Sequence, residues 1–210
     1  MMFEAMREAM VDSQLRPTGV NDPVVLAAIR AVPRERFVPP ARAGLAYADT
    51  AIEIAPGRWL LEPLVTGLLL THARIMASDR VLVVGAGTGY AAAIIAKLSR
   101  HVTAVEENPG LVLAAKANGV DVVSGPLAAG WAANAPYDLI FIDGAAAVLP
   151  PELLAQSAGD GRLAAVMIGD DGVGRATVGR VAGGHFAGTG FFDTGAVALP
   201  GFGHAPKFVF

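Results

Sequence analysis

The sequence predicts an α/β fold in which a mostly parallel central sheet is flanked by helices and preceded by an N-terminal helical elaboration. From Asp79 onward, short apolar runs alternate with helical segments at the spacing of βαβ units. The first run, 80–84, leads into a glycine-rich loop, a common junction between a strand and the next helix. The chain is 53% hydrophobic and 17% charged, which suits small apolar side chains packed between helices and a buried parallel sheet.

Charge, cysteine content and hydropathy exclude several classes of function. The net charge of −3 provides no basic surface for nucleic acid or for an anionic membrane. The absence of cysteine excludes disulfides, a thiolate nucleophile and zinc–thiolate sites. The N-terminus lacks the apolar core of a signal peptide, and the longest apolar stretches fall far short of the ~18 residues of a membrane span. We therefore expect a cytoplasmic protein that binds neither nucleic acid nor membrane. No pattern in the chain predicts an oligomeric state.

The first part of the chain is expected to be helical. Helices are predicted over 3–15, 22–32 and 63–74. The second begins at Asn21 or Asp22 as N-cap, with Pro23 in its first turn. The prolines of 32–40 predict an ordered, extended connection instead of regular structure.

The rest of the chain is expected to alternate between strands and helices. Strands are predicted over 80–84, 101–105, 120–123, 137–142 and 162–168, and helices over 89–99, 109–117 and 150–157. After Gly172 the pattern predicts antiparallel strands over 175–182, 185–193, 195–199 and 205–210, with turns at 183–184 and 201–203. No repeat or linker interrupts the chain. We therefore expect a single domain, 1–210, made of an N-terminal elaboration (1–78), a βαβ core (79–170) and C-terminal antiparallel strands (171–210).

The most informative motif is the loop that follows the strand over 80–84. Glycines at 85, 87 and 89 allow close backbone approach to a ligand. Glu106 closes the next strand, where a carboxylate is placed to accept hydrogen bonds from both ribose hydroxyls of a nucleoside. Glu107, beside it, is expected to face solvent because adjacent strand residues point in opposite directions. Together the loop and Glu106 predict a nucleoside site.

Two other interpretations of this motif remain open. A glycine-rich strand–helix turn can be purely structural, since many α/β folds contain one. NAD is the main competing ligand, but dinucleotide sites favour the spacing Gly-x-Gly-x-x-Gly, whereas this chain has Gly-x-Gly-x-Gly. The observed spacing better suits a ligand without phosphates.

Beyond this loop, nearly the whole chain resembles protein-L-isoaspartate O-methyltransferases, as a divergent member. The segments that carry the resemblance are Met10-Val11-Asp12-Ser13-Gln14-Leu15, Val20-Asn21-Asp22-Pro23-Val24-Val25-Leu26-Ala27-Ala28, Val32-Pro33-Arg34-Glu35-Arg36-Phe37-Val38-Pro39 and Leu45-Ala46-Tyr47-Ala48-Asp49. The resemblance implies a Rossmann-like methyltransferase domain that uses S-adenosyl-L-methionine as cofactor. The cofactor-binding residues that it implies, with their neighbours, are Gly85, Ala86, Gly87, Thr88, Gly89, Tyr90, Glu106, Gly125, Leu127 and Asp143. Pro126 stands where the family usually has an aspartate beside the adenine, leaving apolar contact or the Leu127 amide to meet the base.

The chain departs from the family on the acceptor side. Members read roughly Gly-Gln-Thr-Ile-Ser-Gln-Pro, whereas this chain reads Gly57-Arg58-Trp59-Leu60-Leu61-Glu62-Pro63. Trp59 and Leu61 replace two hydroxyl residues that help hold the substrate's carboxylates. Arg58 is a candidate partner for a substrate carboxylate, through its planar guanidinium. The acceptor-site candidates are therefore Arg58, Trp59, Leu61 and Glu62, although Trp59 and Leu61 are equally compatible with a role in the core.

The expected reaction is carboxyl O-methylation of a protein or peptide, with isoaspartate as the acceptor that the resemblance implies. A carboxylate is ionised at neutral pH, so the reaction requires neither an enzymic nucleophile nor a general base. Asp143 and Asp170-Asp171 follow neighbouring strands and make Mg²⁺ an alternative, but the prediction is that no metal binds. A different acceptor, or a catalytically degenerate protein that still binds S-adenosylmethionine, remains the alternative function.

Overall fold

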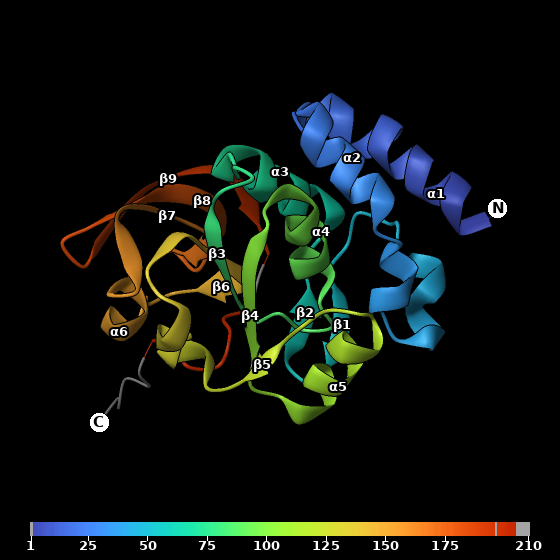
Figure 1. Cartoon of the computed structure of the whole chain (residues 1–210). Helices are drawn as coiled ribbons and strands as arrows, with labels where there is room; N and C mark the ends of the chain where they lie inside the picture. Colours follow the sequence, from blue (N-terminus) through green and yellow to red (C-terminus); the bar gives the residue numbers. More distant parts are fainter. Residues whose placement is uncertain (1, 196, 205–210) are drawn as a thin grey trace, which may run out of the picture.

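The protein is described by a computed structural model that covers residues 2–195 and 197–204. Its centre is a seven-stranded sheet with the order β5-β4-β3-β6-β7-β8-β9. The strands are β3 (Arg80–Val84), β4 (His101–Glu106), β5 (Val123–Ser124), β6 (Tyr137–Ala146), β7 (Ser157–Ile168), β8 (Gly174–Ala182) and β9 (His185–Thr194). The first five of these are parallel, and β8 and β9 extend the sheet in antiparallel fashion. The predicted fold class is therefore confirmed (Figure 1).

Helices cover the sheet and form the N-terminal region (Figure 1). The α-helices are α1 (Met2–Met10), α2 (Pro23–Ala31), α3 (Pro63–Ala73), α4 (Tyr90–Leu98), α5 (Pro109–Ala117) and α6 (Pro151–Leu154). A π-helical turn (Val11–Leu15) and a 3-10 turn (Arg16–Thr18) continue α1. Asp22 caps α2 by accepting hydrogen bonds from the amides of Val24 and Val25, as its position in the sequence predicts.

The structure differs from the sequence prediction in the proline-rich segment 32–40. Instead of one extended connection, the chain forms 3-10 turns over Arg34–Phe37 and Pro40–Leu45. Proline lacks an amide proton but keeps its carbonyl, and the carbonyls of Pro33 and Pro39 accept the i→i+3 hydrogen bonds of Arg36 and Arg42. Prolines therefore open these turns.

The C-terminal prediction is partly wrong. The turn at Gly183-Gly184 joins β8 and β9 as expected, with positive φ at both glycines. Among the described residues of 195–199, however, the structure shows an isolated parallel bridge between Ala145 and Ala198 in place of a strand. The strand predicted over 205–210 lies outside the described residues.

A small antiparallel hairpin, absent from the sequence prediction, precedes α3. It consists of β1 (Ile52–Ala55) and β2 (Arg58–Leu60) and forms its own two-stranded sheet. The turn contains Gly57, whose φ of 70° lies in the left-handed region. The side chains of Ile52, Arg58 and Leu60 are buried, whereas Trp59 is exposed. The hairpin therefore has one face turned toward the protein interior.

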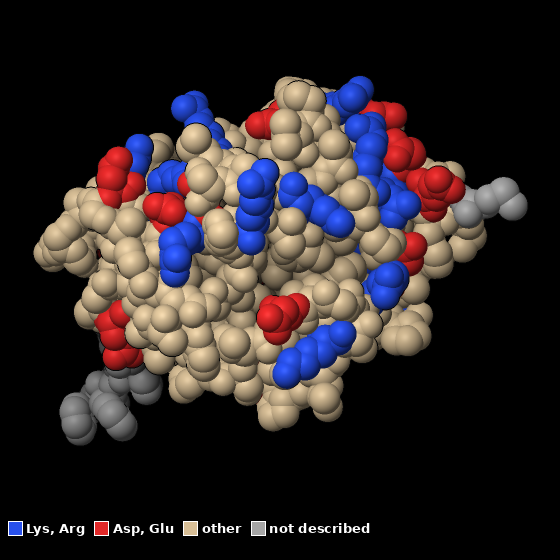
Figure 2. All heavy atoms as spheres, in the orientation of Figure 1, with Lys and Arg blue, Asp and Glu red and all other residues tan. Residues whose placement is uncertain are grey.

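Two apolar clusters occupy the two faces of the sheet because successive strand residues point to opposite sides. Val81 and Val83 belong to the cluster that includes α2, α3 and α4, whereas Leu82 and Val84 belong to the cluster that includes α6. On the face shown in Figure 2, charged side chains of both signs are scattered over a mostly uncharged surface. Within 2–195 and 197–204, no helix has the length and apolar character needed to traverse a bilayer.

Candidate functional site

The glycine loop forms the turn that the sequence predicts, between β3 and α4. The amides of Gly85 and Ala86 both donate to the carbonyl of Val105, at 3.0 and 3.1 Å, which fixes the loop against the end of β4. Gly85, Gly87 and Gly89 have φ angles of 75°, 57° and 98°. A side chain would be strained at each of these positions, so the loop depends on glycine for its shape.

Thr88 and Tyr90 attach the loop to the N-terminal region. The Thr88 hydroxyl donates to the Phe37 carbonyl at 2.6 Å. The Tyr90 ring is buried edge-on to Phe37, with ring centroids 5.5 Å apart, and the Arg34 guanidinium lies 4.7 Å from the Tyr90 centroid. Burial raises the pKa of the Tyr90 phenol. These two candidate residues therefore make structural contacts, and the Thr88 hydroxyl already has a protein partner.

Glu106 is fully buried at the end of β4, and its carboxylate accepts five hydrogen bonds. Three come from backbone amides, those of Gly87 at 2.8 Å, Glu107 at 3.0 Å and Asn108 at 2.9 Å. The other two come from the guanidinium of Arg58, at 2.6 Å to Oε1 and 2.7 Å to Oε2. A carboxylate offers about four lone-pair sites, so this one is saturated by the chain itself.

Arg58, which the sequence predicts as an acceptor-side candidate, is therefore paired with the acid at the end of β4. Its side chain extends from β2 to Glu106 and is only 5% exposed. The pair forms because a buried guanidinium needs a counter-charge, and the planar fork matches a carboxylate in bidentate fashion. In this arrangement the guanidinium is bound to Glu106 and is not available to a substrate carboxylate.

Trp59 and Leu61 line an apolar cavity next to this ion pair. The cavity has a volume of about 240 Å³, and its lining is Ala51, Gly57, Trp59, Leu61, Gly144, Gly195, Val197 and Leu199. Trp59 is 39% exposed and Leu61 is 3% exposed. Glu62, the fourth acceptor-side candidate, turns inward, and its buried Oε2 has no hydrogen-bond partner. The described residues that line the cavity include no charged side chain and no hydroxyl.

Asp143 adds a further buried acid at the carboxyl end of β6. Burial, with a smaller contribution from the charge of Glu106, raises the pKa of its carboxyl to about 7 against the opposing charges of Arg34 and Arg58. Arg34 itself is fully buried, and burial lowers the pKa of its guanidinium. The structure thus brings two arginines and two acids into one buried electrostatic cluster.

The segment where the resemblance places adenine recognition lies beside Glu106. The Gly125 amide donates to the Glu106 carbonyl at 3.1 Å. The Leu127 amide, expected to be free to meet a base, instead donates to the Glu107 carboxylate at 3.2 Å. Glu107 is half-buried, so the expectation that it faces solvent is wrong. Its carboxylate turns back because the Leu127 amide needs an acceptor.

Two apolar side chains cover the glycine loop. A Cβ at Gly87 would lie 2.8 Å from Ile54 Cδ1, and one at Gly85 would lie 2.6 Å from Leu199 Cδ1. Leu199 is held in place by its amide, which donates to the Ala145 carbonyl at 2.8 Å. The chemistry of the loop and of Glu106 fits a nucleoside cofactor, and the side chains that lie against them are those of Ile54, Arg58 and Leu199.

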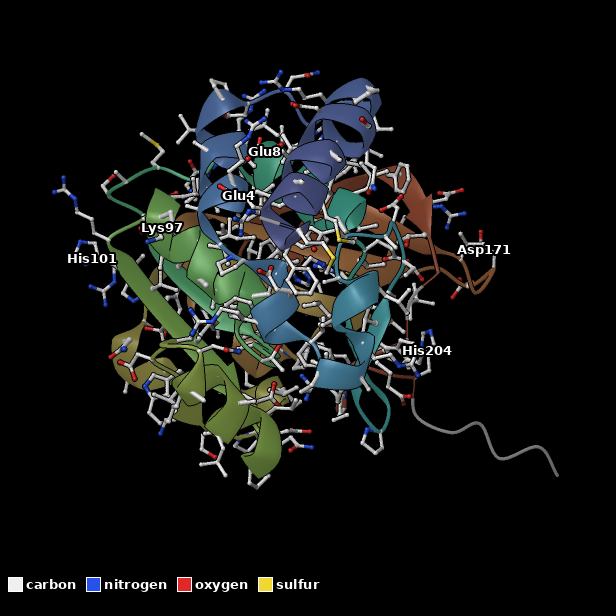
Figure 3. All side chains as sticks on the ribbon, turned by 90° about the vertical axis from the view of Figure 1, so that its right-hand side faces the viewer. Glu4, Glu8, Lys97, His101, Asp171 and His204 are labelled. Atoms are coloured by element: carbon white, nitrogen blue, oxygen red, sulfur yellow. The ribbon has the colours of Figure 1, made fainter. Side chains whose placement is uncertain are left out.

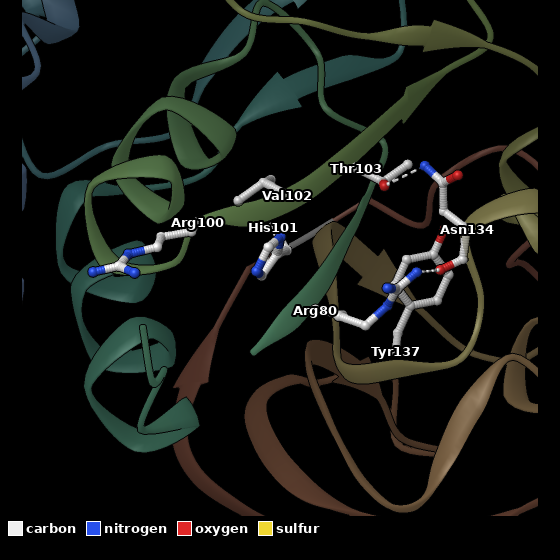
Figure 4. A pocket seen from close by; sticks show the side chains of 7 residues that line it. All are labelled: Arg80, Arg100, His101, Val102, Thr103, Asn134 and Tyr137. Carbon is white, nitrogen blue, oxygen red and sulfur yellow. Dashed lines mark hydrogen bonds between the residues drawn. The ribbon is translucent and has the colours of Figure 1, made fainter. Parts of the chain in front are cut away.

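Other clusters of polar residues lie elsewhere. No group of three potential metal ligands occurs within the described part of the chain. Asp171 forms an exposed pair with Arg175, which lowers the pKa of its carboxyl to about 2, and lies across the molecule from His101 (Figure 3). A pocket of about 230 Å³ is lined by Arg80, Arg100, His101, Val102, Thr103, Asn134 and Tyr137 (Figure 4). It lies at the amino ends of β3 and β4, opposite the edge where parallel sheets bind ligands.

The fold and the glycine-loop site define a Rossmann-like, S-adenosylmethionine-dependent methyltransferase. Residues 5–175 match the family model of protein-L-isoaspartate(D-aspartate) O-methyltransferase. The protein-L-isoaspartate O-methyltransferase of Methylorubrum extorquens (strain PA1) is 41% identical over 163 residues, 75% of this chain and 72% of the relative. That of Protochlamydia amoebophila (strain UWE25) is 39% identical over 161 residues, 73% of this chain and 77% of the relative. The chain belongs to the protein-L-isoaspartate(D-aspartate) O-methyltransferase family, as its sequence predicts.

A solved structure agrees on the fold. The Plasmodium falciparum protein-L-isoaspartate O-methyltransferase, in complex with S-adenosyl-L-homocysteine, superposes with a TM-score of 0.76 at 20% identity, covering 94% of this chain and 97% of that one. The family match ends at residue 175, so Leu199, which covers Gly85, lies beyond it.

Sequence reasoning missed the partners of the loop, namely the β1–β2 hairpin and Leu199. One signal for Arg58 is available in retrospect. It is the lone charge before the apolar run Trp59-Leu60-Leu61, and a charge buried with such a run needs an opposite charge. No comparable signal points to Leu199.

Proposed function

We propose that this chain transfers the methyl group of S-adenosylmethionine to the carboxylate of an isoaspartyl residue in a protein or peptide, in the cytoplasm. The observation that carries the proposal is the hydrogen bond at 2.8 Å between the Gly87 amide and Glu106, which joins the glycine loop to the acid on β4. In this fold, those two elements bind a nucleoside. The names of the curated relatives support isoaspartate as the acceptor.

When bound, S-adenosylmethionine supplies a methyl group on a sulfonium, so that a C–O bond to the acceptor carboxylate forms as the C–S bond breaks and a neutral thioether leaves. The chain's own task is to bind, orient and exclude water. Gly85, Gly87 and Glu106 hold the nucleoside, and the cavity beside Trp59 and Leu61 keeps water from the reacting atoms. Positioning of this kind contributes about 7–11 kcal/mol to a barrier reduction. An ionised carboxylate needs no general base, so Asp143 has no proton to remove.

The test is methyl ester formation on an isoaspartyl peptide, with the same peptide containing ordinary aspartate as control. We expect esterification of the isoaspartyl peptide alone. Esterification of neither peptide, by a protein that binds S-adenosylhomocysteine, would contradict isoaspartate as the acceptor.

A second candidate function is methylation of a different, less polar acceptor. It is favoured by the apolar lining of the 240 Å³ cavity, where Trp59 and Leu61 replace the hydroxyl residues that the family uses. Under this alternative, a substrate carboxylate entering the cavity loses its hydration without gaining hydrogen bonds, which is unfavourable. Isoaspartyl peptides would then be poor substrates.

Restoring the hydroxyls in a Trp59→Thr/Leu61→Ser variant tests this second candidate. Each recovered hydrogen bond to a charged group contributes about 1.5–3 kcal/mol, so kcat/KM for the isoaspartyl peptide should rise by one to several powers of ten. S-adenosylhomocysteine affinity and the melting temperature of the variant serve as controls for folding, because Leu61 is buried. High activity of the parent on the isoaspartyl peptide, or no gain in a folded variant, would count against this second candidate, and the first of these outcomes would favour the ordinary isoaspartyl reaction.

A further inference from the structure

We propose that Arg58 is an internal competitor of the cofactor: its guanidinium holds the Glu106 carboxylate and must leave before a ribose can bind there. This inference rests on the proposed function, because it concerns the regulation of the same site. The hydrogen bonds of Glu106, the construction of the β1–β2 hairpin and the burial of the ion pair support it.

The hydrogen bonds of Glu106 leave no free acceptor for a diol. Oε1 accepts from Arg58 Nη1, the Glu107 amide and the Asn108 amide, and Oε2 accepts from Arg58 Nη2 and the Gly87 amide. The three amide donors belong to the loop and to the chain directly after β4, so they are fixed by the same backbone that positions Glu106. Arg58 is the donor that comes from a separate element, 48 residues away in sequence. It is therefore the donor that ribose hydroxyls would replace.

The hairpin that carries Arg58 forms a sheet of its own, with Ile52 and Leu60 on its inner face packed in the apolar core. Among the described residues, its two strands pair with each other and with no strand of the central sheet. An isolated two-stranded hairpin is only marginally stable, so its position depends on what its inner face contacts. That face places Ile54 over Gly87 and the Arg58 guanidinium 3.5 Å from the Cβ position at Gly85. Displacement of this one hairpin would therefore remove Ile54 from Gly87 and Arg58 from Glu106 together, while Leu199 would still lie against Gly85.

Burial strengthens the ion pair between Arg58 and Glu106, with which the cofactor must compete. Arg58 and Glu106 are 5% and 0% exposed, and a pair in such surroundings is screened little by water or salt. The cofactor must therefore displace an interaction that is already favourable. If the open state is about a tenth of the population, the apparent Kd is raised about tenfold.

Titration of the full-length protein with S-adenosylhomocysteine, followed by calorimetry, tests the proposal. The Arg58→Gln variant introduces the residue that family members have at this position and removes the competing charge. We expect it to bind S-adenosylhomocysteine at least tenfold more tightly than the parent. The matched control is Arg162→Gln, which removes a partly buried arginine from its pair with Asp79, away from the loop, and should leave the affinity unchanged. Equal or weaker binding by a folded Arg58→Gln protein would overturn the proposal.

A kinetic measurement on a protein that keeps Arg58 makes the proposal testable if Arg58→Gln does not fold. Trp59 neighbours Arg58 on β2, so in a Trp131→Phe variant, where Trp59 is the single tryptophan, we expect its fluorescence to report on the hairpin. If Arg58 must first leave, the observed rate of S-adenosylhomocysteine binding should reach a plateau at high ligand concentration, set by hairpin opening. A rate that rises linearly throughout would overturn the proposal. Failure of both the parent and a folded Arg58→Gln protein to bind S-adenosylhomocysteine would instead overturn the proposed function, and this inference with it.

Discussion

Replacing Glu106 with glutamine should destabilise the fold even in the absence of any ligand. Glutamine keeps the shape of the side chain but removes its charge and turns one acceptor oxygen into a donor amide. Arg58 is then left buried without its counter-charge, and at least one of the three amide donors faces another donor. Removal of one partner of a buried ion pair costs about 3–5 kcal/mol.

The expected change in melting temperature follows from the size of the chain. At about 2.1 cal/mol/K per residue, the 210 residues give an unfolding entropy of about 0.44 kcal/mol/K. The loss in stability therefore corresponds to a decrease in Tm of roughly 7–11 °C. Differential scanning calorimetry of the ligand-free protein measures this directly.

Two further variants separate the ion pair from other effects. Glu106→Gln/Arg58→Gln removes both charges and should melt above Glu106→Gln, because no buried charge is left unpaired. Asp171→Asn breaks an exposed ion pair with Arg175 and should leave Tm nearly unchanged. A Glu106→Gln protein that melts within about 2 °C of the parent would refute the reasoning. A double variant that melts below the Glu106→Gln single variant would refute it as well.

Two other predictions concern stability near the site. Asp143 has a pKa raised to about 7 in the folded chain against about 3.9 when unfolded. Between about pH 4 and pH 7 the carboxyl of Asp143 is therefore protonated in the folded chain and ionised in the unfolded chain. The contribution of this proton to the free energy of unfolding is fully present below about pH 4 and is lost as the pH rises to 7. Asp143→Asn should flatten the dependence of unfolding free energy on pH in that window, measured by urea denaturation; an unchanged slope would contradict the assignment. Thr88→Val should cost about 1–3 kcal/mol, because it leaves the buried Phe37 carbonyl without its donor, and an unchanged urea midpoint would show that this hydrogen bond contributes nothing.

Elements specified by local sequence were predicted well. The strand over Arg80–Val84 and the helix over Pro109–Ala117 have the predicted bounds. An uninterrupted apolar run defines the strand. Asn108 caps the helix by accepting hydrogen bonds from the amides of Gly110 and Leu111. Such signals lie within a few residues of the element that they specify, so a single sequence reveals them.

The missed features depend on contacts between distant residues. The strands of the β1–β2 hairpin have four and three residues, too few for a clear alternation of polar and apolar positions. The partner of Glu106 is 48 residues away, and Leu199 covers a glycine more than a hundred residues before it in the chain. The contact of Arg58 with Glu106 joins two elements that are distant in sequence, so the neighbours of Arg58 in the chain do not reveal it.

The burial of Arg34 links the N-terminal helices to the sheet, which affects how cooperatively the chain unfolds. Its guanidinium donates to the carbonyls of Ala46 and Leu61, at 2.7 and 2.6 Å, and lies over the ring of Tyr90, the first residue of α4. The apolar cluster that contains Tyr90 also includes Met10 near the N-terminus and Val166 in β7. A chain that lacks the residues before α3 would therefore expose apolar surface on α4 and the sheet. It would also lose Ile54, which covers Gly87 in the glycine loop. We expect the N-terminal helices and the sheet to melt in one cooperative transition, with no folded fragment remaining.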